Sequence, residues 1–330
     1  LLIELNILHR RINVSKLNLF WPVYKNLEKE FLNIADYIHF SDDQTKVYSM
    51  HIADLIVRCS IEIEAISKEL YLQIGGDPSP VNNTGDKRDL YFDTDCLDLL
   101  EQKWSLSKKQ VIVSATTFYF TNESNRIFTP LKKANKRGSS GSKWKRAYQA
   151  VKHDRKSSLK IANIENLLHA MGALYILNLY YRNEIFDMST IEFDNRVGSD
   201  IFSVFTYNAS SLKISQYMDD NCINKLLGNN LDNSIYIIKY DDKSFREMHE
   251  NFCRDARITL DNFKNSPEII NFLSENPNYK AENINTTCFD AGGINLVEKI
   301  LSLNHTQKHS YKKEAIINKH TNIYPTLSPI

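Results

Sequence analysis

An arginine and a histidine near the middle of the chain have the spacing and the chemistry of a phosphate-cleaving site. Arg146 and His153 stand seven positions apart in the segment WKRAYQAVKHDR, residues 144–155. A helix turns by about 100° per residue, so this spacing puts both side chains on one face, about 10 Å apart along the axis. The guanidinium can bind phosphate through paired charged hydrogen bonds, and the imidazole can transfer a proton near neutral pH. RNA cleavage without a metal ion needs these two groups.

The remaining residues of the segment divide between the two sides of the expected helix. Three polar residues share the side of Arg146 and His153: Gln149, Lys156 and Lys160. Three larger residues project from the opposite side: Trp144, Tyr148 and Val151. The residues expected to support the Arg/His pair are Gln149, Lys152, Asp154, Arg155, Glu62 and Glu64. Glu62 and Glu64 cannot share a helix face. They could form structural ion pairs, with Arg155 as one partner, or support catalysis.

Basic residues are concentrated around this segment. Between residues 131 and 160 there are eleven Lys and Arg residues and one acidic residue, although the whole chain has 41 basic and 40 acidic residues. Such a stripe predicts binding to the phosphates of a nucleic acid. The residues expected to contact RNA are Lys132, Lys133, Lys136, Arg137, Lys143, Lys145, Lys156, Lys160, Trp144 and Tyr148. The alternative is a solvated basic face, with Trp144 and Tyr148 in the core instead of stacking on bases.

Helices with regular apolar spacing are expected to position these residues. Apolar side chains recur at steps of three and four over residues 22–40 and 47–74, which is typical of amphipathic helices. Two further helices are expected, one beginning at the N-cap residue Ser142 and one over 159–186. We expect them to pack as an antiparallel bundle. Its predicted core contains Ile52, Cys59, Ile63, Leu167, Leu174 and Leu177.

The rest of the chain has a mixed pattern. Residues 77–95 have the composition of a loop, and a short helix is expected within 92–104. Residues 111–114 and 118–120 could form a hairpin, and 201–207 and 235–240 are expected as strands. An amphipathic helix is expected over 242–263, followed by a poorly ordered tail beyond His305. The predicted organisation is a helical domain over residues 1–190 and an α+β extension over 191–330.

Composition excludes several classes of protein. With 10 Gly and 8 Pro in 330 residues, the chain is neither collagen-like nor a Pro/Gly-rich disordered protein. Its five cysteines form no C-x-x-C pair, which favours a reducing cytosol and no cysteine-based zinc site. The most apolar window, residues 161–181, is interrupted by polar residues and predicts a core helix instead of a membrane span. No signal peptide, metal site or cofactor motif is expected, although the sequence begins with Leu.

The complete segment resembles the R-x(4–6)-H motif of HEPN domains. The Arg146–His153 gap is the longest that the motif allows, and the order W-x3-Y-x3-K-H-D-R precedes a long apolar helix. Upstream, residues 60–70 (SIEIEAISKEL) resemble the acidic helix of a bacterial HEPN-like group. The resemblance covers roughly residues 20–190. Ala147 stands where many active members have Asn, Asp or His, and Gln149 stands where Asn is frequent.

This resemblance implies a mainly α, HEPN-like antiparallel helical bundle that forms a homodimer. The small α+β extension is expected from the sequence pattern of residues 191–330. In active members the two Arg/His motifs meet across the dimer, and the 2′-hydroxyl of RNA attacks the adjacent phosphate to leave a cyclic phosphate. Arg146 would then stabilise the phosphate, and His153 would act as acid and base. The implied protein is a cytoplasmic endoribonuclease of bacterial toxin or antiviral defence systems, which could include a partner protein. The alternative is a non-catalytic module that binds RNA, nucleotide or a protein partner.

Overall fold

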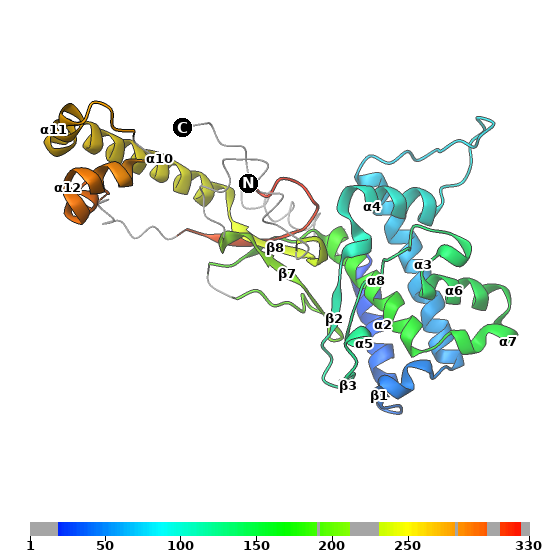
Figure 1. Cartoon of the computed structure of the whole chain (residues 1–330). Helices are drawn as coiled ribbons and strands as arrows, with labels where there is room; N and C mark the ends of the chain where they lie inside the picture. The colour runs from blue at the N-terminus through cyan, green and yellow to red at the C-terminus, as the bar shows by residue number, and fades with distance from the viewer. Residues whose placement is uncertain (1–18, 190–191, 212–230, 281–282, 302–310, 325–330) are drawn as a thin grey trace, which may run out of the picture. The chain divides into compact units, whose positions relative to one another are not determined.

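A computed structural model describes residues 19–189, 192–211, 231–280, 283–301 and 311–324 of the chain. Most of the regular structure is helical, as expected from the sequence (Figure 1). The described residues fall into two compact units. The larger unit contains those up to residue 211 together with 231–239 and 314–323, and the smaller unit contains 240–280, 283–301, 311–313 and 324. The boundary expected near residue 190 falls within the larger unit.

Four helices form the body of the larger unit: α2 (Trp21–Ile34), α3 (Met50–Gln73), α6 (Lys143–His153) and α8 (Ile164–Arg182). Helix α3 begins where Ser49 accepts a hydrogen bond from the Ile52 backbone N–H at 3.1 Å. Helix α8 is capped in the same way by Asn163, since both residue types favour the N-cap position. Helix α8 is buried almost all round, which explains its uniformly apolar sequence.

Consecutive helices of this set run antiparallel, so α3 and α8 run in the same direction. The N-termini of α3 and α8 meet where Ile164 donates a backbone hydrogen bond to Val47 at 3.0 Å. Further along, Cys59 of α3 contacts Met171 of α8. Helix α6 runs against α3, because Arg155, just after its end, pairs with Asp54 near the start of α3. Within the expected antiparallel bundle, α3 and α8 therefore pack against each other as a parallel pair.

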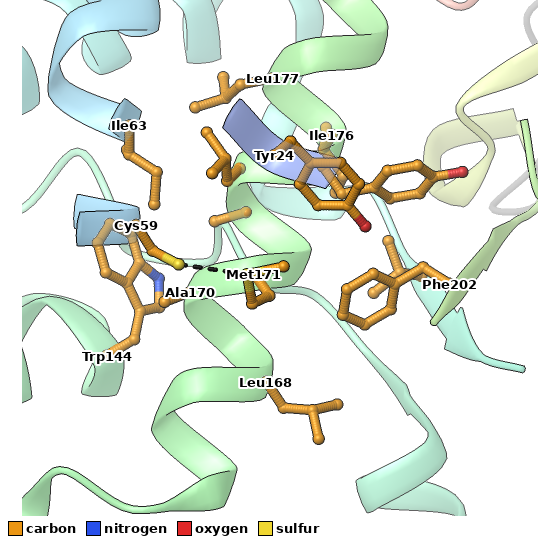
Figure 2. Packing of buried hydrophobic residues seen from close by; sticks show 14 of the residues in the cluster. Tyr24, Cys59, Ile63, Trp144, Leu168, Ala170, Met171, Ile176, Leu177 and Phe202 are labelled. Atoms are coloured by element: carbon orange, nitrogen blue, oxygen red, sulfur yellow. Dashed lines mark hydrogen bonds between the residues drawn. The ribbon is translucent and has the colours of Figure 1, made fainter. Parts of the chain in front are cut away.

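The core between these helices matches the apolar stripes of the sequence. All six predicted core residues, which are Ile52, Cys59, Ile63, Leu167, Leu174 and Leu177, are fully buried. Figure 2 shows Cys59 and Ile63 facing α8, with Trp144 of α6 beside them. The Sγ atom of Cys59 lies 3.2 Å from the Sδ atom of Met171. Burial at these positions confirms the helical periodicity of the two long segments.

Short strands lie against the bundle. Strand β2 (Val111–Val113) pairs antiparallel with β4 (Ile127–Phe128) and with β6 (Phe202–Val204). Strand β1 (Phe40–Ser41) pairs in parallel with β3 (Phe118–Tyr119). The expected hairpin of residues 111–120 was therefore wrong in its pairing. Both edges of β2 are occupied by β4 and β6, so β3 cannot pair with it. Helix α2 ends at Ile34, and the chain then forms β1 beside β3.

A four-stranded sheet collects segments that lie far apart in the sequence. Its order is β5 (Phe186–Asp187), β9 (Lys313–Ile317), β8 (Tyr236–Tyr240) and β7 (Thr206–Asn208). The expected strand of residues 235–240 is confirmed as β8. The expected strand of residues 201–207 is instead divided into β6 and β7, which belong to different sheets. The expectation of a poorly ordered tail was wrong for β9, where Ala315 and Ile317 are buried. Residues 302–310 and 325–330 lie outside the described part of the chain.

The other elements are short or belong to the smaller unit. A π-helical turn (Phe92–Leu97) leads into α4 (Asp98–Trp104), and α5 (Glu123–Arg126) and α7 (Arg155–Ser158) are single turns. The smaller unit contains α10 (Asp242–Lys264), α11 (Pro267–Glu275) and α12 (Ile284–Leu301). Its core consists of Ile269, Cys288, Leu296 and Ile300. No helix in the described ranges is long and apolar enough to cross a membrane.

A buried carboxylate joins α2 to the start of β6. Glu28 is fully buried and accepts hydrogen bonds from the Tyr24 hydroxyl at 2.9 Å and from the backbone N–H groups of Asp200 and Ile201 at 3.0 and 3.2 Å. The Ser199 hydroxyl donates to the same carboxylate. Burial raises the pKa of Tyr24, and the negative charge of Glu28 raises it further. These bonds hold residues 199–201 in place.

Candidate functional site

Helix α6 carries both residues of the predicted Arg/His pair. It begins at Lys143 and ends at His153, because Asp154 has non-helical backbone angles of φ −147° and ψ 78°. The Asp154 carboxylate instead caps α7 by accepting a hydrogen bond from the Ser157 N–H at 3.2 Å. The helix therefore ends before Lys156 and Lys160. The projection that placed these two lysines on the Arg146 face was wrong for that reason.

Arg146 and His153 are both exposed on α6. Among the residues that the structure describes, neither side chain makes a hydrogen bond or an ion pair. Both lie within one continuous helix, so they share a face at an axial separation of about 10 Å. Gln149 lies between them and is half-buried. This face offers one cation, one amide and one imidazole to a ligand.

The aromatic residues of α6 belong to the core and not to this face. Trp144 is 1% exposed, and its indole N–H donates to the Pro130 carbonyl at 2.9 Å. Tyr148 is 4% exposed. Burial first, and then the Glu64 carboxylate, raise the pKa of Tyr148 against the opposing charge of Lys152. Neither ring can stack on a base, so the prediction of a stacking platform was wrong and its core alternative is confirmed.

Lys145 also points into the protein instead of toward a ligand. Its ammonium is buried 3.1 Å from the Asp93 carboxylate and donates to the carbonyls of Ala134 and Lys136. Asp93 also accepts a hydrogen bond from Arg137 at 3.0 Å. Burial would raise the pKa of Asp93, but the Thr94 N–H and these two cations lower it overall. Lys145 therefore fixes the loop of residues 131–141 and is not an RNA contact.

Three more of the expected cations are paired on the surface. Lys136 lies 3.7 Å from Asp98, and Lys143 lies 2.9 Å from Glu165, which also pairs with Lys46. Arg155 pairs with Asp54 at 3.1 Å. The expected pairing of Arg155 with Glu62 or Glu64 was therefore wrong, because Arg155 lies opposite the start of α3.

Glu62 and Glu64 have different surroundings on α3. Besides burial, the negative charge of Glu64 raises the pKa of the Tyr148 hydroxyl, so Glu64 acts on α6. Glu62 is half-buried, and burial raises its pKa despite the nearby Arg58. Lys152 lies 5.5 Å from the centre of the Tyr148 ring. Glu64, Tyr148 and Lys152 thus form one cluster beside His153, while Glu62 is not part of it.

The cations of residues 131–160 that make no ion pair with another described residue define the open basic surface. They are Lys132, Lys133, Arg146, Lys152, Lys156 and Lys160, all exposed. The carboxylates that pair with the other cations come from α3, α4, α8 and the π-helical turn. Sequence reasoning missed Asp54, Asp93, Asp98 and Glu165 in this role. No signal in the sequence identifies them, because each is distant from its partner along the chain.

A second imidazole that the sequence did not single out lies near the start of α8. His169 lines a small cavity together with Thr45, Asn125 and Glu165. Its ring stacks on Phe128, with ring centres 4.2 Å apart. Burial lowers the pKa of His169 to about 4, against the opposing charge of Glu165. At neutral pH this imidazole is uncharged.

Neither a metal site nor a relative identifies the chemistry of this surface. Within the described parts of the chain, no group of three or more His, Cys, Asp or Glu side chains is arranged to hold a metal ion. Comparison with protein-family models, curated proteins and solved structures found no match to this chain.

Proposed function

We propose that the protein is a metal-independent endoribonuclease of the HEPN type, in which Arg146 binds the scissile phosphate and His153 transfers protons. The observation that carries the proposal is that both side chains are exposed and unpaired on one face of α6. Five neighbouring cations form ion pairs with carboxylates that hold the fold together. Arg146 and His153 form no ion pair with a described residue, so their polar groups are available to a ligand. The open lysines beside them supply a field that attracts a polyanion.

The proposed chemistry follows from the two groups. The neutral imidazole of His153 takes the proton of the 2′-hydroxyl, whose oxygen attacks the adjacent phosphorus. The guanidinium of Arg146 stabilises the charge that develops on the phosphate oxygens. The bond to the 5′-oxygen breaks, and the leaving oxygen takes the proton from the imidazolium of His153, which returns to its neutral form. The products are a 2′,3′-cyclic phosphate and a free 5′-hydroxyl.

We propose further that the active species is a homodimer. About 10 Å of helix separates Arg146 from His153, which is more than one phosphate spans. A twofold axis would place Arg146 of one copy opposite His153 of the other and form two equivalent sites. Both residues are exposed, so the face is open to a second copy.

Cleavage of a labelled RNA by the purified full chain in EDTA tests the proposal. His153→Ala should reduce the rate about 10²–10⁴-fold, the range typical of a proton-transfer group, and Arg146→Ala should have a comparable effect. Two matched controls, His51→Ala and Arg246→Ala, remove exposed residues elsewhere and should retain full activity. The products should carry a cyclic phosphate. Activity that persists in His153→Ala would contradict the proposal.

A mixing experiment distinguishes a shared site from a site within one copy. Arg146→Ala and His153→Ala are each inactive, but in an equal mixture half the dimers contain one copy of each. If sites are shared, one of the two sites in these dimers is intact, and about a quarter of wild-type activity returns. If each site lies within one copy, no activity returns.

A defence or toxin role follows from such an activity. Expression of the wild-type chain in bacteria should arrest growth, whereas the two inactive variants should be tolerated. The second candidate is an RNA-binding module that does not cleave. It is favoured by Ala147, which is fully buried and supplies no polar side chain at the position directly after Arg146. It predicts that the wild type binds RNA, that binding falls in Arg146→Ala, and that no cyclic phosphate forms.

A further inference from the structure

A buried lysine in the larger unit contacts a histidine from the C-terminal part of the chain. Lys109 is 0% exposed, and its Nζ atom lies 3.1 Å from the Nε2 atom of His320. Lys109 also donates to the Asp232 backbone carbonyl at 3.0 Å. Three segments distant in sequence therefore meet at one amine. No part of the proposed ribonuclease chemistry uses this cluster.

The contact between Lys109 and His320 depends on the protonation states of the two side chains. For Lys109 to donate to His320, the Nε2 atom must keep its lone pair, so the imidazole must be neutral with its proton on Nδ1. When His320 takes up a proton, both atoms become donors and both groups can carry charge. A buried ammonium and a partly exposed imidazolium 3.1 Å apart repel each other. Protonation therefore breaks the contact that neutral His320 makes.

Within the described residues, the charged groups that act on this pair are Asp232, Lys108 and Glu101 of α4. Asp232 lies 3.8 Å from the His320 Nε2 and pairs with Lys108 at 2.7 Å. Burial lowers the pKa of Lys109 to about 7, more than Asp232 and Glu101 raise it, and Lys108 lowers it further. Burial and Lys109 likewise lower the pKa of His320. The two carboxylates therefore do not restore the ordinary pKa of either group.

His320 belongs to a segment that closes over the bundle after strand β9. Asn318, fully buried, donates to the carbonyls of Leu231 at 2.7 Å and Ser234 at 3.1 Å. The Tyr180 hydroxyl of α8 donates to the Asn318 carbonyl at 2.6 Å. Beside it, Lys319 lies above the ring of Trp104, with its Nζ 5.7 Å from the ring centre. The segment thus covers Trp104 and is fastened at both Asn318 and His320.

We propose that Lys109 and His320 form a pH-sensitive latch, which fastens residues 318–320 to the rest of the larger unit at neutral and alkaline pH and releases them on acidification. In the closed state both pKa values are lowered, so the open state binds protons more readily. Closing is therefore most favourable at high pH. The free energy that favours the closed state falls as the pH drops toward 7, because Lys109 takes up a proton more readily in the open state. It falls again below pH 6.5, because the same is true of His320.

Hydrogen exchange of the full chain, measured by mass spectrometry between pH 8 and pH 5, tests the latch. Variants are compared with the wild type at the same pH, so the intrinsic effect of pH on exchange cancels. His320→Gln keeps an acceptor for Lys109 but cannot take up a proton. We expect residues 313–323 of the wild type to lose protection by up to about tenfold per pH unit below 6.5, the limit for one proton. In His320→Gln this dependence should disappear.

A matched histidine and a fluorescence signal complete the test. His51→Gln removes an exposed histidine at the start of α3 and should behave as the wild type. Release of the segment should uncover Trp104, so tryptophan emission should shift to longer wavelength at acidic pH in the wild type but not in Trp104→Phe. If wild type and His320→Gln lose protection equally at every pH, the latch does not exist. Lys109→Met is a second variant, and it should also exchange without the pH dependence.

Discussion

The ammonium of Lys145 and the carboxylate of Asp93 form an ion pair 3.1 Å apart, with 5% and 8% of the two side chains exposed. The pair joins α6 to the π-helical turn before α4, beneath the loop that carries the open lysines. A charge in such a place is costly when its partner is removed. The stability of the basic loop therefore depends on an acidic residue outside it.

Asp93→Ala should destabilise the protein more than Lys145→Met. The first change leaves a buried ammonium without its counterion, at a cost of about 3–5 kcal/mol. The second leaves Asp93 with hydrogen bonds from Thr94 and Arg137, so it should cost less. Urea denaturation of both variants gives the comparison. Equal losses would mean that the ion pair does not hold the loop.

Glu28 of α2 allows a second stability test. Glu28→Ala removes the acceptor for the hydroxyls of Tyr24 and Ser199 and for two backbone N–H groups. The Tyr24 hydroxyl and the Ile201 N–H also contact the Ser199 hydroxyl, but the Asp200 N–H is left without its acceptor, at a cost of about 1–3 kcal/mol. Glu28→Gln keeps one carbonyl oxygen and should lose less. Thermal unfolding of the two variants measures the difference, and an Ala variant as stable as the Gln variant would contradict it.

RNA affinity should depend on the unpaired lysines more than on the paired ones. Replacement of Lys132 and Lys133 by Glu should weaken binding to all RNA sequences alike, and should reduce the salt slope by about 0.7 for each phosphate that is no longer neutralised. Replacement of Lys136 and Lys143, which are already neutralised by Asp98 and Glu165, should have a smaller effect on RNA. Titrations at several salt concentrations measure both. An equal effect of the two pairs would show that the structural pairing does not persist with RNA.

Acid should weaken the fold through His169. Its pKa is about 4 in the folded chain, below the 6.5 of an exposed histidine, so the unfolded state binds the proton first. Stability should therefore fall as the pH drops from 6.5 to about 4, by about 3 kcal/mol at most. His169→Phe keeps a ring against Phe128 and removes the titration. Denaturation curves at pH 7 and pH 4.5 should differ less for the variant than for the wild type.

The helices were predictable because their apolar residues repeat with a helical period. The stripe containing Ile52, Cys59 and Ile63 is buried along α3, as its spacing requires. The end of α6 was missed, although Asp154 is a favoured N-cap residue and marks the new turn. That signal was present in the sequence. Because the predicted helix was continued through Asp154, Lys156 and Lys160 were wrongly placed on the face of Arg146.

Long-range pairing was not predictable in the same way. No local pattern indicates that Lys145 faces Asp93 instead of solvent, since the residue type alone does not distinguish a buried lysine from an exposed one. The pairing of β2 with β6 and not with β3 likewise depends on which segments the tertiary structure brings beside β2. Composition identified the basic segment, but only the fold separates the cations that hold the loop from those that remain open.

Strand β9 is synthesised after both of the strands that it joins, and this order affects folding. It lies between β5 and β8, although both precede it on the ribosome by a long stretch of chain. Helices α2 to α8 can assemble as they emerge, whereas the edges of β5 and β8 that face β9 stay unpaired until residues Lys313–Ile317 have been made. Exposed strand edges promote association with other chains. A messenger truncated before the codons of Lys313–Ile317 should therefore yield an aggregating product rather than a smaller folded protein.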